Sequence, residues 1–368
     1  MSCLIKRFIL SCIIVCATSF VSYAQPKAIG GSFSFSGIGL MYEHFLSPSC
    51  FVEADIRTET GEFFMGRADI PGFSASITSN FILKEWKSAN ENIISIFAGA
   101  GVAVGKSNDY HKADGHFFGM KGRAGIECLF DRNISISMSL NPVVGSHLIV
   151  FEDHAKLEYY KNGFMNLVMP EIGVKYAFNS NRTGEHRTDL RRFTFGAEWG
   201  YVGTFYSGYH YNFFAPEGYR VDPRRHGFTY TSNGEVFVHA GYNLGDKSNL
   251  SVYLGFSAIE EYHHIIPVSI RYTRYYKANK VGDRWFSFID AGSGISIKKI
   301  PQEILTGKVG GGYRICLGND MNLDFLVSLR TVLTHPDIDY YGTAIPSDRI
   351  NRNNAYSSAI SVGMALTL

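Results

Sequence analysis

The sequence has no apolar run long enough to cross a membrane as a helix. A bilayer-spanning helix takes about 20 consecutive apolar residues. The longest such stretch here, residues 8–17, has roughly half that number. Spanning by α-helices is therefore excluded, and any contact with a bilayer has to come from another structure.

Cysteine is scarce, and no catalytic or metal-binding motif is present. Of the six cysteines, three lie within the first 24 residues, and Cys50, Cys128 and Cys316 remain at wide spacing. An odd number at such spacing is neither a disulfide framework nor a CxxC metal pattern. HExxH and GxSxG are also missing. The sequence predicts no catalytic residue, no metal ligand and no cofactor.

Charge is low and nearly balanced. Charged residues make up 18% of the chain, and the formal net charge is +2. A nucleic-acid partner would call for a strongly basic surface, so we expect none.

Residues 1–24 have the pattern of an export signal. Lys6 and Arg7 precede the apolar stretch, and Ser22 and Ala24 put small residues at the two positions that a signal peptidase reads. We expect cleavage before Gln25 and export through the inner membrane.

Apolar residues alternate with polar ones instead of forming long core runs, although the chain contains 28 Phe, 22 Tyr and 38 Gly. In segment 133–141, Ile134, Ile136, Met138 and Leu140 fall on one side, with serine and asparagine on the other. Successive side chains of a strand point to opposite faces, so this segment predicts a ribbon with one apolar and one polar face. The same alternation recurs in segments 116–130, 193–205, 321–333 and 355–368.

Two folds accommodate this alternation. A soluble sandwich or barrel turns its apolar face inward, whereas a transmembrane barrel turns it toward lipid. The predicted strands have about 10–14 residues, the length that a tilted membrane strand requires. Their polar face is rich in small residues, and short connections alternate with long ones. We predict an all-β, antiparallel, up-and-down transmembrane β-barrel.

The connections divide the chain into two halves. We expect tight turns near residues 47–49, 131–132, 245–247 and 318–320, and long loops near 60–73, 105–115, 150–162, 209–227, 294–306 and 335–354. Residues 25–178 and 193–368 then hold about eight strands each. The polar, charged segment 179–192 is predicted to link them. In the first strand pair, 28–46, Gly37 and Gly39 interrupt the alternation.

Two architectures follow: two small barrels in tandem, or one barrel of about sixteen strands. Eight strands leave an interior that side chains fill, whereas sixteen leave an aqueous channel. The polar faces carry both signs of charge in each half, which permits pairing inside a narrow barrel and favours the tandem arrangement. The expected inward-facing charged residues are Lys121, Arg123, Glu127, Glu171 and Lys175 in the first half, and Glu198, Glu235, His239, Arg271, Asp324 and Arg330 in the second.

Aromatic clusters mark where such a barrel would meet the lipid headgroups. A binding surface is the other interpretation of these clusters, but a girdle of aromatic residues is typical of barrels at both membrane interfaces. The residues assigned to this girdle are Tyr206, Tyr209, Tyr211, Phe213, Tyr275 and Tyr276.

Several motifs of this sequence are typical of one group of proteins. They are Gly39-Leu-Met-Tyr-Glu-His-Phe-Leu46 before a Ser-Pro turn, the glycine-rich strand 97–105, Phe195-Gly-Ala-Glu-Trp-Gly-Tyr201, Ser207-Gly-Tyr-His-Tyr-Asn212, Glu217-Gly-Tyr-Arg220 and Val309-Gly-Gly-Gly-Tyr-Arg314. Through these motifs the sequence resembles small outer-membrane β-barrel families of Gram-negative bacteria, especially those of Bacteroidetes. The resemblance implies an outer-membrane location and an eight-stranded unit, with no established activity. The chain ends on Thr367-Leu368 instead of the terminal aromatic residue usual in such proteins.

The sequence is compatible with three functions. The first is a structural or surface-binding barrel, with outer-membrane lipid and the barrel insertion machinery as partners and its surface ligand unspecified. The second is a porin-like passive channel for small solutes. The third is a hydrolase at the outer rim that uses loop residues such as His154 and His335 beside their acidic neighbours.

Overall fold

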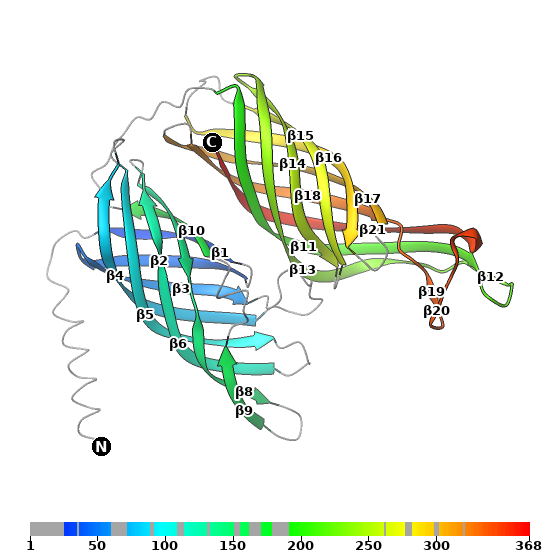
Figure 1. Cartoon of the computed structure of the whole chain (residues 1–368), viewed down its shortest axis with the longest axis horizontal. Helices are drawn as coiled ribbons and strands as arrows, with labels where there is room; N and C mark the ends of the chain where they lie inside the picture. Colours follow the sequence, from blue (N-terminus) through cyan, green and yellow to red (C-terminus); the bar gives the residue numbers. More distant parts are fainter. Residues whose placement is uncertain are drawn as a thin grey trace.

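A computed structural model describes residues 26–34, 37–59, 72–88, 92–108, 114–130, 133–150, 155–161, 171–178, 191–260, 263–276, 282–297, 302–318 and 321–368. Nearly all of the described residues form antiparallel β-structure arranged as two closed rings (Figure 1). Within the described residues, no helix is long and apolar enough to cross a membrane. Residues 1–24 and 179–190, which hold the predicted signal and most of the predicted linker, lie outside the described residues.

The first ring contains eight strands. They are β1 (Lys27–Ser34), β2 (Gly37–Ser47), β3 (Cys50–Glu59), β4 (Gly72–Lys87), β5 (Ile93–Asn108), β6 (Asp114–Leu129), β7 (Ile134–Leu140) and β10 (Glu171–Phe178). Each strand pairs with the next, and β10 closes the ring by pairing with both β7 and β1. Closure leaves no unpaired edge in the ring, which the interior of a membrane requires.

An additional hairpin extends the first ring at the long-loop end. It consists of β8 (Val143–Val150), which continues β7 after Pro142, and β9 (Ala155–Lys161). Strand β6 is long enough to pair with β7 along one part and with β8 along the other. The long loop predicted near 150–162 is strand over 155–161, where β9 pairs with β8, and residues 151–154 lie outside the described residues.

The second ring also contains eight strands. They are β11 (Phe193–Phe214), β13 (Arg224–Gly245), β14 (Ser248–Glu260), β15 (His263–Tyr275), β16 (Arg284–Ile297), β17 (Gln302–Gly318), β18 (Met321–Thr334) and β21 (Ile350–Thr367). Pairing of β11 with β21 closes this ring. The chain forms two eight-stranded barrels and not one barrel of sixteen strands.

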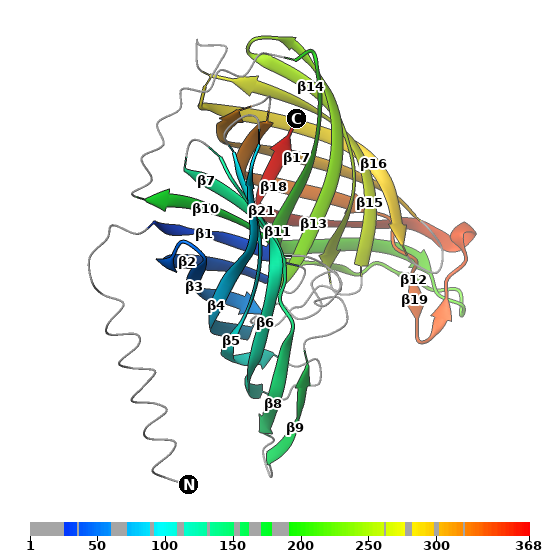
Figure 2. The ribbon, with the colours of Figure 1, turned by 60° about the vertical axis from the view of Figure 1, so that its left-hand side comes forward.

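Three strands of the second ring continue beyond it. Strands β11, β13 and β21 project to one side and carry β12 (Arg220–Val221), β19 (Asp339–Tyr340), β20 (Thr343–Ala344) and the short helix η1 (Ser347–Arg349) at their far end (Figures 1 and 2). We call this part the extension. It consists of β11 from Tyr206 onward, β13 up to Phe228, β21 up to Tyr356, and the segments that connect these strands at their far end. The predicted loop 209–227 is mostly strand here, because paired backbone continues the ring's ladders. In the predicted loop 335–354, strand covers residues 339–340, 343–344 and 350–354.

The side chains of both rings are distributed inside out relative to a soluble protein. Large apolar residues face outward and are exposed, such as Leu40 (71%), Met120 (70%) and Ile289 (61%), while charged residues are buried inside. Water would penalise an apolar surface that covers two whole barrels, but lipid favours it. This distribution is that of a transmembrane barrel.

The outer walls of the two barrels touch near the ends that carry the short turns. Phe130, Ile134 and Val174 of the first barrel form one buried cluster with Leu317 and Leu323 of the second. These are outward positions that would otherwise face lipid. Figure 1 shows the two barrels side by side, and the cluster lies where their outer walls meet.

We expect a charge on the outer face to destabilise the barrel in lipid. Ile289 lies near the middle of β16 and points outward. Ile289→Arg should lower the free energy of unfolding in vesicles by about 2–4 kcal/mol, the cost of an arginine at mid-bilayer. The same change at Tyr341, which is 90% exposed on the extension, serves as the control. Equal stability of the two variants in denaturant titrations would show that the outer face does not contact lipid.

Candidate functional site

The interior of the first barrel is built around a buried lysine. Lys175 of β10 lies against the carboxylate of Glu43, 2.5 Å from Glu127 and 3.7 Å from Glu53. Arg123 pairs with Glu53 at 2.9 Å, and its guanidinium lies over the ring of Phe97, 4.6 Å from the centroid. Each of these charges has an opposite charge within contact distance, which offsets the cost of removing it from water.

A second group of charges lies nearer the long-loop end of the same interior. Arg57 pairs with Asp55 at 2.8 Å and with Glu171. Lys121 donates a hydrogen bond of 2.9 Å to the hydroxyl of Ser76 and lies 3.9 Å from Asp55. Charged side chains thus fill the first barrel from several strands.

The interior of the second barrel is organised around two glutamates that are fully buried, Glu198 and Glu235. Arg271 contacts Glu198 at 2.5 Å, and Arg330 contacts Glu235 at 3.0 Å. Lys308 lies between them, 3.2 Å from Glu198 and 2.8 Å from Glu235. One continuous network therefore joins strands on opposite sides of the ring.

Aromatic rings fill the space beside this network. The Arg271 guanidinium lies 3.9 Å from the ring centroid of Tyr253 and 4.2 Å from that of Phe288. A side chain at Gly312 would collide with Phe286, since its Cβ would lie 2.7 Å from the ring. The glycine run of β17 therefore makes room for aromatic side chains in the interior.

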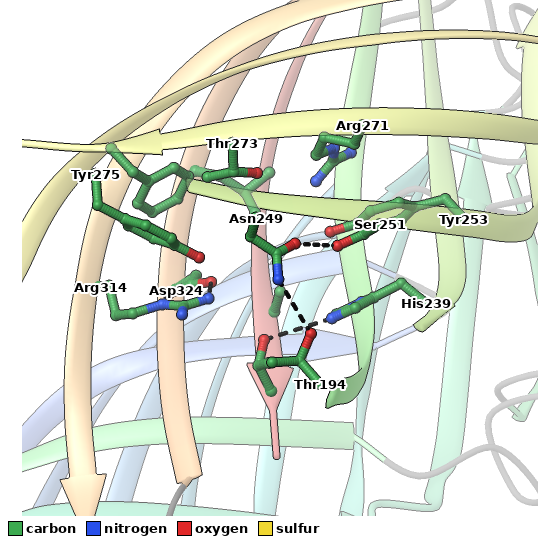
Figure 3. A pocket seen from close by; sticks show the side chains of 14 residues that line it. Thr194, His239, Asn249, Ser251, Tyr253, Arg271, Thr273, Tyr275, Arg314 and Asp324 are labelled. Carbon is green, nitrogen blue, oxygen red and sulfur yellow. Dashed lines mark hydrogen bonds and ion pairs between the residues drawn. The ribbon is translucent and has the colours of Figure 1, made fainter. Parts of the chain in front are cut away.

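Toward the short-turn end, the second barrel encloses a small polar cavity. Figure 3 shows Thr194, His239 and Asn249 on one side of it, with Arg314 bound to Asp324 by two hydrogen bonds of 2.6 and 2.7 Å on the other. Its volume is about 20 Å³, which is room for roughly one water molecule. Pockets that bind small molecules have volumes of roughly 300–1,000 Å³, so this cavity is far too small to be one of them.

All the charged residues that the sequence predicted to face inward lie inside the barrels. The interiors also contain charged residues that were not predicted from the sequence. Lys121, Arg123, Glu127, Glu171, Lys175, Glu198, Glu235, His239, Arg271, Asp324 and Arg330 all lie in the interiors. The residues missed are Glu43, Glu53, Asp55 and Arg57 in the first barrel, and Arg284, Asp290, Lys308 and Arg314 in the second. For Glu53, Asp55 and Arg57 a signal existed: three charged residues spaced by two alternate with Ala54 and Ile56.

The predicted aromatic girdle needs correction. Tyr275 is 3% exposed and lines the interior cavity, so it cannot belong to an outer belt. Its neighbour Tyr276 is 63% exposed. Adjacent strand residues point to opposite faces, so both could not belong to one girdle.

A β-bulge changes the faces of β11. Its pairing shifts register between Thr204 and Tyr206. Tyr206 then packs on the outer face against Phe228, which is 88% exposed, with ring centroids 5.6 Å apart. The inner face after the bulge carries Tyr209, Tyr211 and Phe213. Assigning these three residues to a lipid-facing girdle is therefore wrong.

The inner face of the extension has a small apolar core of its own. Phe213 packs with Ile338 and Ile345 from the segment that returns over it, and all three are buried. Beyond this core, Tyr219 and Tyr340 join their hydroxyls at 3.0 Å, and this hydrogen bond raises the pKa of Tyr340. Ordered aromatic residues are thus held at the far end of the extension.

Histidines of the long-loop end assemble no metal centre in the described parts of the chain, where no three His, Cys, Asp or Glu side chains come together as ligands. His335 is exposed, and His154 lies outside the described residues. His210 is held by two neighbours. Its Nε2 lies 2.8 Å from Asp222, and its Nδ1 lies 3.0 Å from Arg352.

No protein-family model matches this sequence, and no curated protein matches it. Solved structures similar to it include a bacterial polysaccharide outer membrane secretin, with 12% identity over 93% of this chain and 97% of that chain and a TM-score of 0.33. Others are the CymD monoaromatic hydrocarbon channel (7% identity; 93% and 87%; TM-score 0.25) and OmpT of Vibrio cholerae (7%; 92% and 95%; 0.21).

The chain is a tandem of membrane-type β-barrels. This conclusion comes from the two closed rings and their inverted burial, since matches of such low identity and TM-score carry no argument about function. The resemblance to Bacteroidetes-type families stays a prediction.

Breaking the network of charges around Glu198 and Glu235 should destabilise the second barrel strongly. Glu235→Ala removes the partner of Lys308 and Arg330 and leaves buried cations uncompensated. We expect a loss of about 3–5 kcal/mol in the free energy of unfolding. Glu303→Ala, which removes an exposed acid of β17, should change it by less than about 0.5 kcal/mol. Comparable losses in the two variants would show that the interior pairing does not stabilise the barrel.

Proposed function

We propose that this protein is a non-conducting outer-membrane anchor that displays the extension as a binding surface outside the cell. The observation that carries the proposal is the filling of both interiors by paired charges and aromatic rings. Solute passage needs a continuous aqueous path, and an eight-stranded barrel whose inward side chains meet across it has no room for one. This favours a surface-binding protein over a porin-like channel.

The outer location of the extension follows from the arrangement of the connections. Barrels of the outer membrane have short turns on the periplasmic side and long loops outside. The extension lies at the long-loop end, opposite the tight turns β13–β14 and β17–β18. This orientation also puts the C-terminus on the periplasmic side.

The construction of the extension supports a binding role. Its apolar core fixes the returning segment, so the exposed tyrosines at its end are held in place before any partner arrives. Tyr219 and Tyr341 are 49% and 90% exposed. Rigid tyrosine-rich surfaces provide contact area at low entropic cost, and this is why tyrosine is enriched in binding sites.

Conductance tests the absence of a channel. The full mature chain, inserted into a planar bilayer and verified by heat-modifiable gel mobility, should leave the bilayer silent because its interiors are filled. A known porin in the same bilayer is the positive control. Steady openings that scale with the amount of inserted protein would contradict the proposal and restore the channel.

Surface labelling tests the orientation. A peptide tag inserted between Tyr341 and Gly342 should be labelled by an antibody on intact cells of a Gram-negative host. The same tag between Asn319 and Asp320, in the connection from β17 to β18, should react only after the cells are permeabilised. The reverse pattern, or labelling of neither tag on intact cells, would refute an outward-facing extension.

A further inference from the structure

The outer face of the extension carries a band of aromatic residues at its base. Tyr206 packs against Phe228 and against Tyr356, with ring centroids 5.6 and 5.9 Å apart. Just below, the hydroxyls of Tyr201 and Tyr230 meet at 2.9 Å. Three adjacent strands contribute to this band, which replaces the girdle expected from the sequence. Aromatic bands of this kind mark the height at which a barrel leaves the hydrocarbon region.

Directly beyond the band, the same outer face becomes basic. His226 lies opposite Gly208, Arg224 lies opposite His210, and Arg352 lies opposite Asn212. Facing residues of an antiparallel pair share a side of the sheet, as do residues two apart in one strand. His210, Arg224, His226 and Arg352 therefore form one row on the outer side, which we call the basic stripe.

Hydrogen bonds hold part of the basic stripe in a defined arrangement. An arginine can only donate, so Nδ1 of His210 accepts from Arg352 and its Nε2–H donates to Asp222. This bond is the main cause that lowers the pKa of Asp222 to about 2, so that Asp222 is ionised at neutral pH. Asp222 also accepts from Arg224 at 3.2 Å. One carboxylate thus positions two arginines without neutralising both.

The height of the basic stripe matches that of lipid headgroups. The stripe begins two residues beyond the Tyr206–Phe228 pair and ends six residues beyond it, which corresponds to roughly 6–20 Å along a strand. With the usual strand tilt, its nearer part lies about 5–10 Å above the aromatic band. This is where the polar headgroups of a bilayer lie, outside the hydrocarbon core.

We propose that the basic stripe binds the phosphate-bearing headgroup of a lipid in the outer leaflet, with the lipid's acyl chains against the aromatic band. The arginine side chain of Arg224 is 64% exposed and free to make further contacts. Guanidinium groups bind phosphate through paired hydrogen bonds, so charge and geometry both fit this occupant. The proposal rests on the outward orientation of the extension proposed above.

The test compares two charge-matched variants of the full chain. The stripe variant, Arg224→Gln/Arg352→Gln, removes two cations of the basic stripe. The control variant, Arg192→Gln/Lys247→Gln, removes two cations at the short-turn end. Each is reconstituted in nanodiscs of phosphatidylcholine with a minor fraction of lipid A, and the lipids that remain bound are counted by native mass spectrometry. We expect lipid A retention to fall about ten-fold or more in the stripe variant and to be unchanged in the control.

Several outcomes would overturn the assignment. Equal retention in all proteins would show that the stripe does not hold the headgroup, and equal loss in both variants would show non-specific attraction. Displacement of the lipid by millimolar inorganic phosphate alone would identify a free-anion site. Heat-modifiable mobility shows that the variants are folded. Surface labelling at Tyr341 shows whether the orientation holds, so failure of this inference can be told apart from failure of the proposed function.

Discussion

Charges buried inside the two barrels have to be paired, and this requirement limits the form that the barrels can take. Lys175, Glu198 and Glu235 are almost completely removed from solvent, so each requires an opposite charge within a few ångströms. Only a ring narrow enough for side chains to meet across it provides those partners. Closure at eight strands, filled interiors and an apolar outer wall are consequences of one arrangement in which polar groups face one another and not lipid.

The same arrangement separates what holds the protein together from what it presents to its surroundings. Inside, the residues form a network that leaves little space, and the outer wall offers a uniform surface to the bilayer. Specific features occur where strands leave the second ring. There the β-bulge after Thr204 exchanges the two faces of β11, so that Phe213 can organise a small core while Tyr206 joins the aromatic band outside. A single extra residue thus makes the extension two-sided.

Much of this could be predicted from the sequence because the side-chain period of a strand is local. Alternation identified the strands of the two rings and an inner face that includes Arg271 and Arg330. The tight turns predicted near 47–49 and 245–247 are confirmed, whereas residues 131–132 and 319–320 lie outside the described residues. Alternation failed where the period is interrupted. Two glycines obscured the parity of β2, which hid Glu43, and the unseen bulge in β11 put Tyr209 and Phe213 on the wrong side.

That the chain is a barrel protein with an apolar exterior can be read from local sequence, since each strand carries its two faces in its own residues. Which charges meet depends on how the rings close. Glu43 and Lys175 are 132 residues apart, and Glu235 and Arg330 are 95 apart. Such partners are set by the number of strands and the register at which the ring closes. Tertiary structure also decided that two rings form instead of one, because that depends on whether β10 returns to β1 and β21 to β11.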